Sequence, residues 1–185
     1  MRKLIVSAWI SLDGIFDADL MNEWFNPFDS VARQDYIRDG ILSADVFMFG
    51  RNTYQMLAPY WSSLKNNEMG VADKLNSAPK YVASKTLKSA EWSNSTIIGK
   101  DLVDEINQLK QHAGSEIQIE GSADLVSSLI KEGLVDELRL LVHPVIMGKG
   151  KRFFKDGATL AGLNLIKTEP IDKGVIVLYY EVVKG

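Results

Sequence analysis

The chain has 185 residues, of which 24 are acidic and 21 basic, and its formal net charge is −3. This slightly acidic balance lacks the basic footprint of a nucleic-acid-binding protein, and the absence of cysteine from the sequence excludes thiol catalysis, iron–sulfur ligation and a disulfide framework. No apolar run approaches the roughly 20 residues of a membrane span, so we expect neither a membrane nor a nucleic acid as a partner. The length suits a single domain over residues 1–185, and we expect a cytoplasmic protein.

Strands and helices alternate through the first two thirds of the chain. Short apolar runs bounded by turn residues are typical of buried parallel strands. Such strands are predicted at residues 3–10, 46–49, 80–84, 96–98 and 117–120. Helices are predicted between them over residues 28–42, 51–57 and 72–76, from the N-cap Asp101 to about Gly114, and from the N-cap Ser122 to Gly133. Pro59 is expected to end the second of these helices.

The last third of the chain changes from this alternation to strands. They are predicted at residues 136–145, 163–169 and 175–183, with loops at 147–152 and 171–174. Consecutive strands joined by short loops pair antiparallel. We therefore predict an α/β fold with a mostly parallel central sheet and antiparallel C-terminal strands.

Two strand-to-helix transitions pass through glycine, at Gly50 and at Gly121, each with a hydroxyl residue close behind. A helix N-terminus leaves backbone N–H groups unpaired and carries partial positive charge, and glycine lets a ligand approach the backbone closely. Each transition therefore suits an anion, and two in one sheet suit a pyrophosphate. The GxGxxG spacing of the usual dinucleotide-binding motif is absent from the sequence, so a nucleotide site here needs another design.

Five segments carry a resemblance to a known family. They are Ser-Leu-Asp-Gly at residues 11–14, Gly-Arg-Asn-Thr-Tyr at 50–54, Gly-Ser at 121–122, Gly-Leu-Val-Asp-Glu-Leu-Arg-Leu at 133–140 and His-Pro-Val-Ile-Met-Gly-Lys-Gly at 143–150. In this order and spacing they resemble the dihydrofolate-reductase-like superfamily, and more narrowly the C-terminal reductase domain of the bacterial bifunctional riboflavin-biosynthesis deaminase/reductase. The resemblance covers essentially the whole chain. It implies a three-layer fold, NADPH across the carboxyl ends of the strands, and a homodimer built on the C-terminal strands.

The resemblance also assigns the cofactor-binding residues. It places a cofactor phosphate at Gly50 and Thr53, and the adenosine 2′-phosphate beside Arg51, whose planar and permanent charge suits phosphate. Lys85 lies at the adenosine end and can neutralise the same 2′-phosphate, which favours NADPH over NADH. The other cofactor-binding residues that it implies are Gly14, Ser84, Thr86, Gly121, Ser122 and Ala123. Ser122 departs from the family pattern, because dihydrofolate reductases carry a second glycine in its place.

The reacting end is less well defined by the sequence. Hydride transfer needs a proton source beside the substrate, and the resemblance places Asp13 near the nicotinamide, which makes it the catalytic candidate. A simple Asp-Gly turn is the alternative interpretation. Asp29 and Asp35 fall in the region where dihydrofolate reductases carry their acid, but neither maps onto it. The sequence has only two histidines, so we expect no metal site.

The substrate is the most open part of the prediction. Similar riboflavin-type reductases carry an acidic pair that serves a ribosylamino substrate, and residues 52–61 of this chain lack it. We therefore expect an NADPH-dependent reductase of a pteridine or a ribosylaminopyrimidine, resembling dihydrofolate reductase and 5-amino-6-(5-phosphoribosylamino)uracil reductase. The alternative is a noncatalytic NADP-binding dimeric module that kept the scaffold and lost the chemistry.

Overall fold

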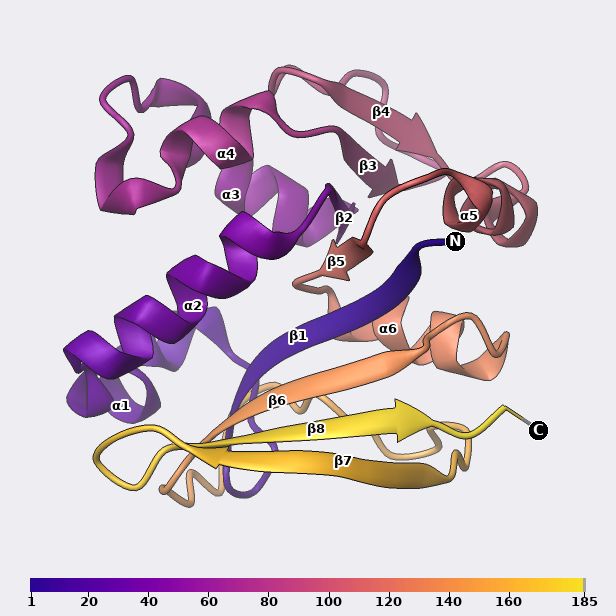
Figure 1. Ribbon diagram of the computed structural model, residues 1–185. Coiled ribbons are helices and arrows are strands. Elements are labelled where there is room, and N and C mark those ends of the chain that lie inside the picture. The colour runs from indigo at the N-terminus through magenta and orange to yellow at the C-terminus, as the bar shows by residue number, and fades with distance from the viewer. Residues whose placement is uncertain (185) are drawn as a thin grey trace.

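The computed structural model describes residues 1–184, and its centre is one eight-stranded sheet (Figure 1). The strands are β1 (Lys3–Ser11), β2 (Val46–Gly50), β3 (Lys80–Ala83), β4 (Ser95–Ile98), β5 (Glu116–Ile119), β6 (Glu137–His143), β7 (Leu163–Pro170) and β8 (Ile176–Val182). The α-helices are α1 (Met21–Trp24), α2 (Val31–Ser43), α3 (Arg51–Ser63), α4 (Ala72–Ser77), α5 (Leu102–Gln111) and α6 (Ala123–Lys131). Three 3-10 turns join them: η1 (Ala18–Leu20), η2 (Asn26–Phe28) and η3 (Glu68–Gly70).

The sheet has the order β4-β3-β2-β5-β1-β6-β8-β7. The six strands from β4 to β6 run parallel to their neighbours, whereas β8 is antiparallel to β6 and β7 is antiparallel to β8. The predicted α/β fold, with a mostly parallel sheet and antiparallel C-terminal strands, is thereby confirmed. Because the carboxyl ends of the parallel strands meet along one edge, the loops that follow them form one surface, where α/β folds commonly bind ligands.

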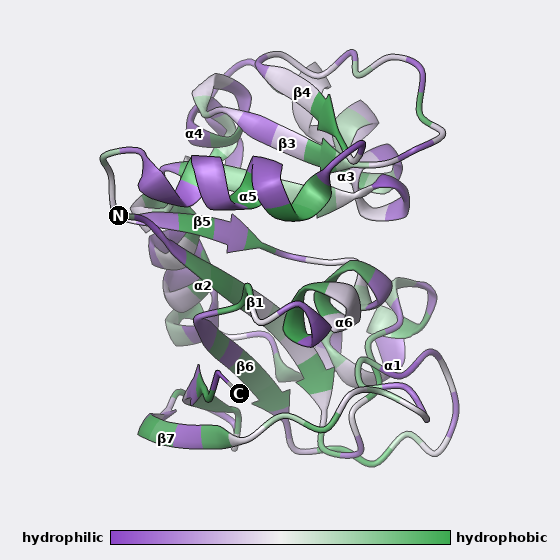
Figure 2. Ribbon diagram, turned by 90° about the vertical axis from the view of Figure 1, so that its right-hand side faces the viewer, coloured by the Kyte–Doolittle hydropathy of each residue, from purple (hydrophilic) through white to green (hydrophobic). Residues whose placement is uncertain are grey.

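Helices cover both faces of the sheet, and the two faces differ in chemistry. Side chains alternate between faces along a strand. The face toward α5 and α6, which lie in front of the sheet in Figure 2, carries apolar side chains: Leu4, Val6, Ala8, Ile10, Ile117 and Ile119. The face toward α2 carries mostly polar side chains on the same two strands and directly after β5, with one aromatic: Ser7, Trp9, Glu116, Gln118 and Glu120. At β1 and β5 the sheet is therefore apolar on one side and largely polar on the other.

Helix α3 corrects a prediction, because it continues through Pro59 to Ser63 instead of ending before it. An interior proline costs a helix roughly 3 kcal/mol through the lost N–H and a clash with the preceding turn. Pro59 lies on the exposed side of α3, while Trp61 packs against the buried cluster around Phe47 and Phe49. Asn76 Nδ2 also donates to the Trp61 carbonyl at 3.1 Å. This packing and capping offset the cost of the proline.

Within residues 1–184 the structure contains no helix with the length and apolar character that crossing a membrane requires.

Candidate functional site

The ends of β2 and β5 lie against each other at two glycines. The Gly50 N–H donates to the Gly121 carbonyl at 3.0 Å. A Cβ at Gly50 would lie 2.6 Å from Ser122 Oγ, and one at Gly121, whose φ is +135°, would lie 3.0 Å from Thr53 Oγ1. Neither position accepts a side chain without a shift of its neighbours. The structure thus brings Gly50, Thr53, Gly121 and Ser122 together at one point.

Two helices begin at this point. Helix α3 starts directly after Gly50, which as N-cap has no side chain to accept from the first-turn N–H groups. Helix α6 has Ser122 as its N-cap, as predicted, and the Ser122 hydroxyl accepts from the Leu125 N–H at 3.4 Å. Both N-termini carry partial positive charge. Together they form a position where a doubly charged group such as a pyrophosphate would be stabilised.

The segment after β3 extends the same edge. An Arg51 Nη donates to Thr86 Oγ1 at 2.8 Å, and both side chains are exposed. The Ser84 hydroxyl accepts from the Thr86 N–H at 3.2 Å and so fixes the turn that carries Lys85. Arg51 and Lys85 are therefore two exposed cations on neighbouring segments, and their charges suit an anion such as a phosphate.

Gly14 lies apart from this group. Its φ is +80°, and its N–H closes a turn onto the Ser11 carbonyl at 2.9 Å. Its carbonyl accepts from the Phe153 N–H at 2.9 Å. Gly14 thereby joins the loop after β1 to residues 151–153 of the loop after β6, and these loops form another side of the site.

A cavity of about 430 Å³ lies beside the two glycines, a size typical of small-molecule sites. Its lining comes from β1 and the loop after it, from α1, from the first half of α3, from the end of β5 and the start of α6, and from the loop after β6. The lining residues are Ser7, Trp9, Phe16, Asp17, Ala18, Met21, Trp24, Asn52, Thr53, Met56, Leu57, Glu120, Ser122, Ala123, Asp124, Lys151, Arg152 and Lys155. Thr53, Ser122 and Ala123 are thus the predicted cofactor residues that reach the cavity.

Asp13 has a different environment from the one expected of a proton source. Its carboxylate accepts from the Ser11 hydroxyl at 2.6 Å and from the N–H groups of Met147 and Gly148 at 3.0 and 2.8 Å. The Ser11 hydroxyl and the Met147 N–H lower the pKa of Asp13 to about 2. The side chain therefore stays ionised at neutral pH and ties two loops together. Its contact with a substrate stays a prediction.

Two further acids considered from the sequence are ion-paired. Asp29 accepts from Gln34 Nε2 at 2.8 Å and from Arg33 at 2.7 Å. Asp35 pairs with Arg38 at 2.6 Å. The N-cap of α2 is Ser30, the residue after Asp29. Both carboxylates therefore have partners of their own on α2.

Glu120 is the residue that sequence reasoning missed. It directly follows β5, precedes Gly121, and lines the 430 Å³ cavity. Its carboxylate accepts from Gln118 Nε2 at 3.0 Å. Burial raises the pKa of Glu120 to about 7, although the Gln118 amide acts in the opposite direction. Polar residues at alternate positions of a buried strand are unusual, and Glu116, Gln118 and Glu120 show that pattern in the sequence.

A second cavity, of about 520 Å³, lies between α2 and the polar face of the sheet. It shares Ser7, Trp9 and Glu120 with the first cavity. Its other lining residues are Ala32, Asp35, Tyr36, Ile37, Asp39, Gly40, Ile41, Ser43, Gln118, Arg139, Glu169, Pro170, Ile171 and Tyr179. The two cavities therefore meet at Glu120, which can contact a molecule in either of them.

Comparisons with known proteins agree with this architecture. The model of the RibD C-terminal domain matches residues 2–177. The uncharacterized protein YyaP of Bacillus subtilis (strain 168) is 28% identical over 185 residues, which cover 97% of this chain and 94% of YyaP. A solved structure from Shewanella sp. PV-4, named as a riboflavin biosynthesis protein, is 23% identical, with a TM-score of 0.75 over 99% of this chain and 100% of its own. A pyrimidine reductase-like protein from Corynebacterium diphtheriae is 16% identical, with a TM-score of 0.70 over 100% of this chain and 93% of its own.

Proposed function

The chain belongs to the RibD C-terminal domain family, and from that premise we propose that it is an NADPH-dependent reductase of a small heterocyclic substrate. One observation carries the proposal: two helix N-termini converge at two glycines that have no room for a side chain, beside a cavity of small-molecule size. Such an arrangement suits a pyrophosphate-containing cofactor. Reduction of a small molecule is the general activity that membership of this family suggests.

The residues at the edge of the sheet fit NADPH. The N-termini of α3 and α6, with the hydroxyls of Thr53 and Ser122, would hold the pyrophosphate. Arg51 and Lys85 would hold the 2′-phosphate, because both are cationic and exposed at the next strand end. When bound, NADPH supplies a hydride for an electrophilic ring carbon of the substrate.

Glu120 is the proposed proton source. Reduction of a C=N bond requires a proton at the nitrogen as well as a hydride at the carbon. With a pKa raised to about 7 by burial, the Glu120 carboxyl is protonated in part of the molecules at neutral pH. It lines the cavity beside the cofactor residues, and because the side chain is partly exposed, solvent can reprotonate it. Asp13, which stays ionised, would orient the loop at the edge of this site.

A cofactor titration tests the proposal. We expect NADPH to quench the tryptophan fluorescence of the chain at lower concentration than NADH, and a panel of pteridines and ribosylaminopyrimidines to contain a compound that supports NADPH oxidation. Saturable NADPH binding without turnover of any compound would instead favour the noncatalytic NADP-binding module. Equal affinity for NADPH and NADH would remove the roles of Arg51 and Lys85.

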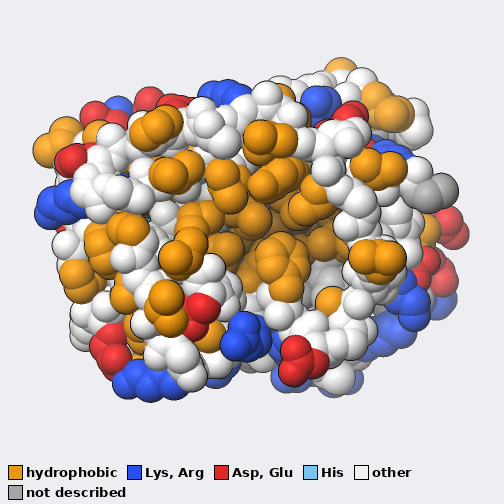
Figure 3. All heavy atoms as spheres, turned by 90° about the horizontal axis from the view of Figure 1, so that it is seen from below, with side chains coloured by type: hydrophobic (Ala, Val, Ile, Leu, Met, Phe, Trp, Pro, Cys, Tyr) orange, Lys and Arg blue, Asp and Glu red, His pale blue; other side chains and the backbone are white. Residues whose placement is uncertain are grey.

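We also propose that the chain forms a homodimer through β7 and β8. The edge strand β7 is exposed along nearly its whole length, and Leu165 and Ile166 are 56% and 53% exposed. Hydrophobic side chains gather on the face below these strands (Figure 3). Exposed apolar edges of this kind mark association surfaces. Sedimentation of the native chain and of a Leu165→Lys variant would test it: a native dimer that becomes a monomer is expected, and a monomeric native chain contradicts the proposal.

A further inference from the structure

A third cavity, of about 220 Å³, lies on the apolar face of the sheet, between α6 and the segment that leads into β7. Its walls are Val126, Ser127 and Ile130 of α6, Leu138 of β6, and side chains from the segment 153–163. A cavity of roughly 150 Å³ with apolar walls binds benzene. The larger cavity beside α6, which we call the α6 pocket, therefore has room for a ligand of about ten non-hydrogen atoms.

Among residues 1–184, one charged side chain, Lys155, lines the α6 pocket, and the other lining residues are apolar or carry a hydroxyl. Phe153 and Phe154 pack edge to face in its wall, with 4.8 Å between the ring centroids, and offer a surface to an aromatic ring. Apolar walls with a single cation favour a molecule that has an apolar body and one negative charge. No carboxylate belongs to this described lining, so none would repel such a molecule.

Lys155 can exchange its present partner for a ligand. Its Nζ pairs with the carboxylate of Asp124 in the first turn of α6, and the Lys155 and Asp124 side chains are 53% and 72% exposed. An ion pair so open to solvent contributes little to stability. Asp124 also keeps the favourable charge of the helix N-terminus when Lys155 leaves it. A ligand carboxylate at the mouth of the α6 pocket can therefore take Lys155 at small cost.

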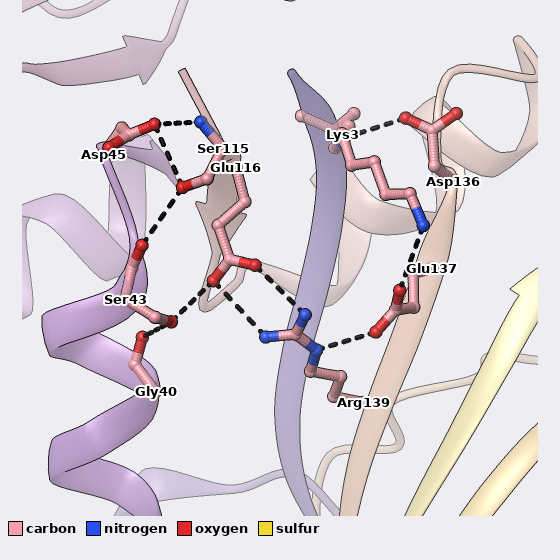
Figure 4. Close-up of polar contacts among 10 residues, drawn as sticks. Lys3, Gly40, Ser43, Asp45, Ser115, Glu116, Asp136, Glu137 and Arg139 are labelled. Carbon is pink, nitrogen blue, oxygen red and sulfur yellow. Dashed lines mark hydrogen bonds and ion pairs between the residues drawn. The ribbon is translucent and has the colours of Figure 1, made fainter. Parts of the chain in front are cut away.

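Arg139, a cation that lines the 520 Å³ groove along α2, cannot change partners in this way (Figure 4). Its Nε donates to Glu137 at 2.8 Å, and its two Nη atoms donate to Glu116 at 3.3 and 3.0 Å. The Ser43 hydroxyl donates to the same Glu116 carboxylate at 2.8 Å. The Arg139 and Glu116 side chains are only 21% and 11% exposed, so a ligand that took Arg139 would leave a buried carboxylate without its cation.

We infer that the α6 pocket binds a small arylalkyl carboxylate, whose ring lies against the two phenylalanines and whose carboxylate takes Lys155 from Asp124. Asp124 and Lys155 also line the 430 Å³ cavity, at the N-terminus of α6. Phe153 contacts Phe16 of that cavity, with 5.2 Å between the ring centroids. An Asp124 carboxylate without Lys155 would repel a phosphate at this N-terminus, so an occupied α6 pocket weakens cofactor binding. This coupling rests on the proposed function, whereas the carboxylate site does not.

Phenylacetate and phenylacetamide, which share a shape and differ in charge, are the matched probes. NMR titration of the full chain should show phenylacetate binding with a Kd of about 1 mM or tighter, with shifts at the Val126 and Ile130 methyls, and the amide binding at least about threefold more weakly. Lys155→Gln should remove the difference between the probes. Asp124→Asn should tighten phenylacetate by about twofold or more, because Lys155 is then free.

Four results of this titration would overturn the inference. They are no phenylacetate binding, equal binding of the two probes to the native chain, a preference for phenylacetate that persists in Lys155→Gln, and an unchanged phenylacetate affinity in Asp124→Asn.

Two neighbouring serines of α6 test the location independently of charge. Ser127 lines the α6 pocket, whereas Ser128 is exposed and outside its lining. Ser127→Phe should weaken phenylacetate by about tenfold or more by occupying the pocket, and Ser128→Phe by less than about twofold. Thermal unfolding shows whether each variant folds, and the Lys155→Gln comparison decides the inference if Ser127→Phe does not. Phenylacetate affinity that is unchanged in a folded Ser127→Phe would place the ligand elsewhere and overturn the inference.

A second copy of the chain is the competing occupant of the α6 pocket. Leu163 belongs both to this pocket and to β7, the edge strand of the proposed dimer. Phenylacetate is therefore also titrated into Leu165→Lys, the variant expected to be monomeric, and similar affinities for the native chain and the variant are expected. Binding to the variant alone would show that a second copy fills the pocket, and would overturn the inference.

NADPH affinity, measured by fluorescence with and without saturating phenylacetate, tests the coupling. We expect NADPH to bind about two- to fivefold more weakly with phenylacetate present, and the effect to disappear in Asp124→Asn. An unchanged NADPH affinity would overturn the coupling. Phenylacetate binding that depends on Lys155, in a chain that does not bind NADPH, defeats the reductase proposal and leaves the carboxylate site standing. NADPH binding without phenylacetate binding does the reverse.

Discussion

The two cavities that meet at Glu120 are built from different parts of the chain. The cavity beside Gly50 and Gly121 adjoins a site made of backbone: two helix N-termini and two glycines at which a Cβ would lie 3.0 Å or less from a neighbouring atom. The groove along α2 owes its character to side chains, which come from α2, β1, β5, β6, β7 and β8. A backbone site of this kind is suited to a phosphate, which every nucleotide cofactor carries. A side-chain site can be changed one residue at a time, and it is where substrate choice would be set.

The largest effect is expected at Glu120, the residue of this prediction that lines both cavities. Glu120→Gln should lower NADPH-dependent turnover by about 100-fold or more, because it removes the proposed proton donor, while NADPH affinity changes by less than about twofold. In the native chain the rate should fall as pH rises through about 7, where Glu120 loses its proton. Steady-state kinetics across pH measure both. Asp104→Asn, at an exposed carboxylate of α5 that lines neither cavity, is the control and should keep the native profile.

A glycine substitution tests the backbone site at the N-termini of α3 and α6. Gly50→Ala places a Cβ 2.6 Å from Ser122 Oγ and 3.1 Å from Ser122 N, so the start of α6 must shift. We expect a loss of NADPH affinity of roughly 30- to 100-fold, or about 2 to 2.7 kcal/mol. Fluorescence titration measures the affinity, and thermal unfolding shows whether the fold survives. Gly40→Ala, with open space around its Cβ, should leave NADPH affinity unchanged; a matching loss there would show that the effect is not local.

A stability measurement tests the environment of Glu120 in the absence of any ligand. The folded chain raises the pKa of Glu120 from 4.5 to about 7 through burial, so between these values the folded state binds the proton more tightly than the unfolded state. The stabilisation that this bound proton provides is therefore lost as pH rises from about 4.5 to about 7, and the pKa difference corresponds to at most about 3 kcal/mol. Melting curves of native chain and Glu120→Gln from pH 5 to 8 should diverge, with the variant less sensitive to rising pH. Parallel curves would mean that Glu120 titrates normally.

The smallest effect is expected at Arg51, where the adenosine end of the cofactor is predicted to bind. Arg51→Ala should weaken NADPH by about tenfold, near 1.4 kcal/mol, because one of two cations facing the 2′-phosphate is lost. NADH, which lacks that phosphate, should be affected by less than about twofold. Parallel titrations with the two cofactors measure the difference, and Lys131→Ala, at the far end of α6, serves as the control. Equal weakening of NADPH and NADH would place Arg51 away from the 2′-phosphate.

The difference between the cavities also explains what the sequence could predict. Gly50, Thr53, Gly121 and Ser122 stand at strand-to-helix transitions, so local rules locate them, and the structure brings them together. The mostly parallel sheet and its antiparallel C-terminal strands likewise follow from periodicity and loop length, whereas the strand order was not predicted. These features depend on residues that are close in sequence.

The groove could not be predicted in the same way, because its walls are distant in sequence. Glu120 and Arg139 become meaningful only when β5 and β6 lie on either side of β1. The surroundings of Asp13 were equally unpredictable from the sequence, because its carboxylate accepts from Ser11, Met147 and Gly148. Its partners lie more than a hundred residues away, apart from Ser11, and no local pattern indicates them.

The position of Glu120 in the wall between the two cavities has a thermodynamic consequence. A cation in either cavity lowers the pKa of this carboxyl and an anion raises it, so the occupant of one cavity sets the charge that the occupant of the other meets. By linkage the effect is reciprocal: whatever factor the first ligand applies to the affinity of the second, the second applies to the first. On the proposed function, a single half-buried side chain would make the binding of two unlike molecules cooperative and dependent on proton concentration.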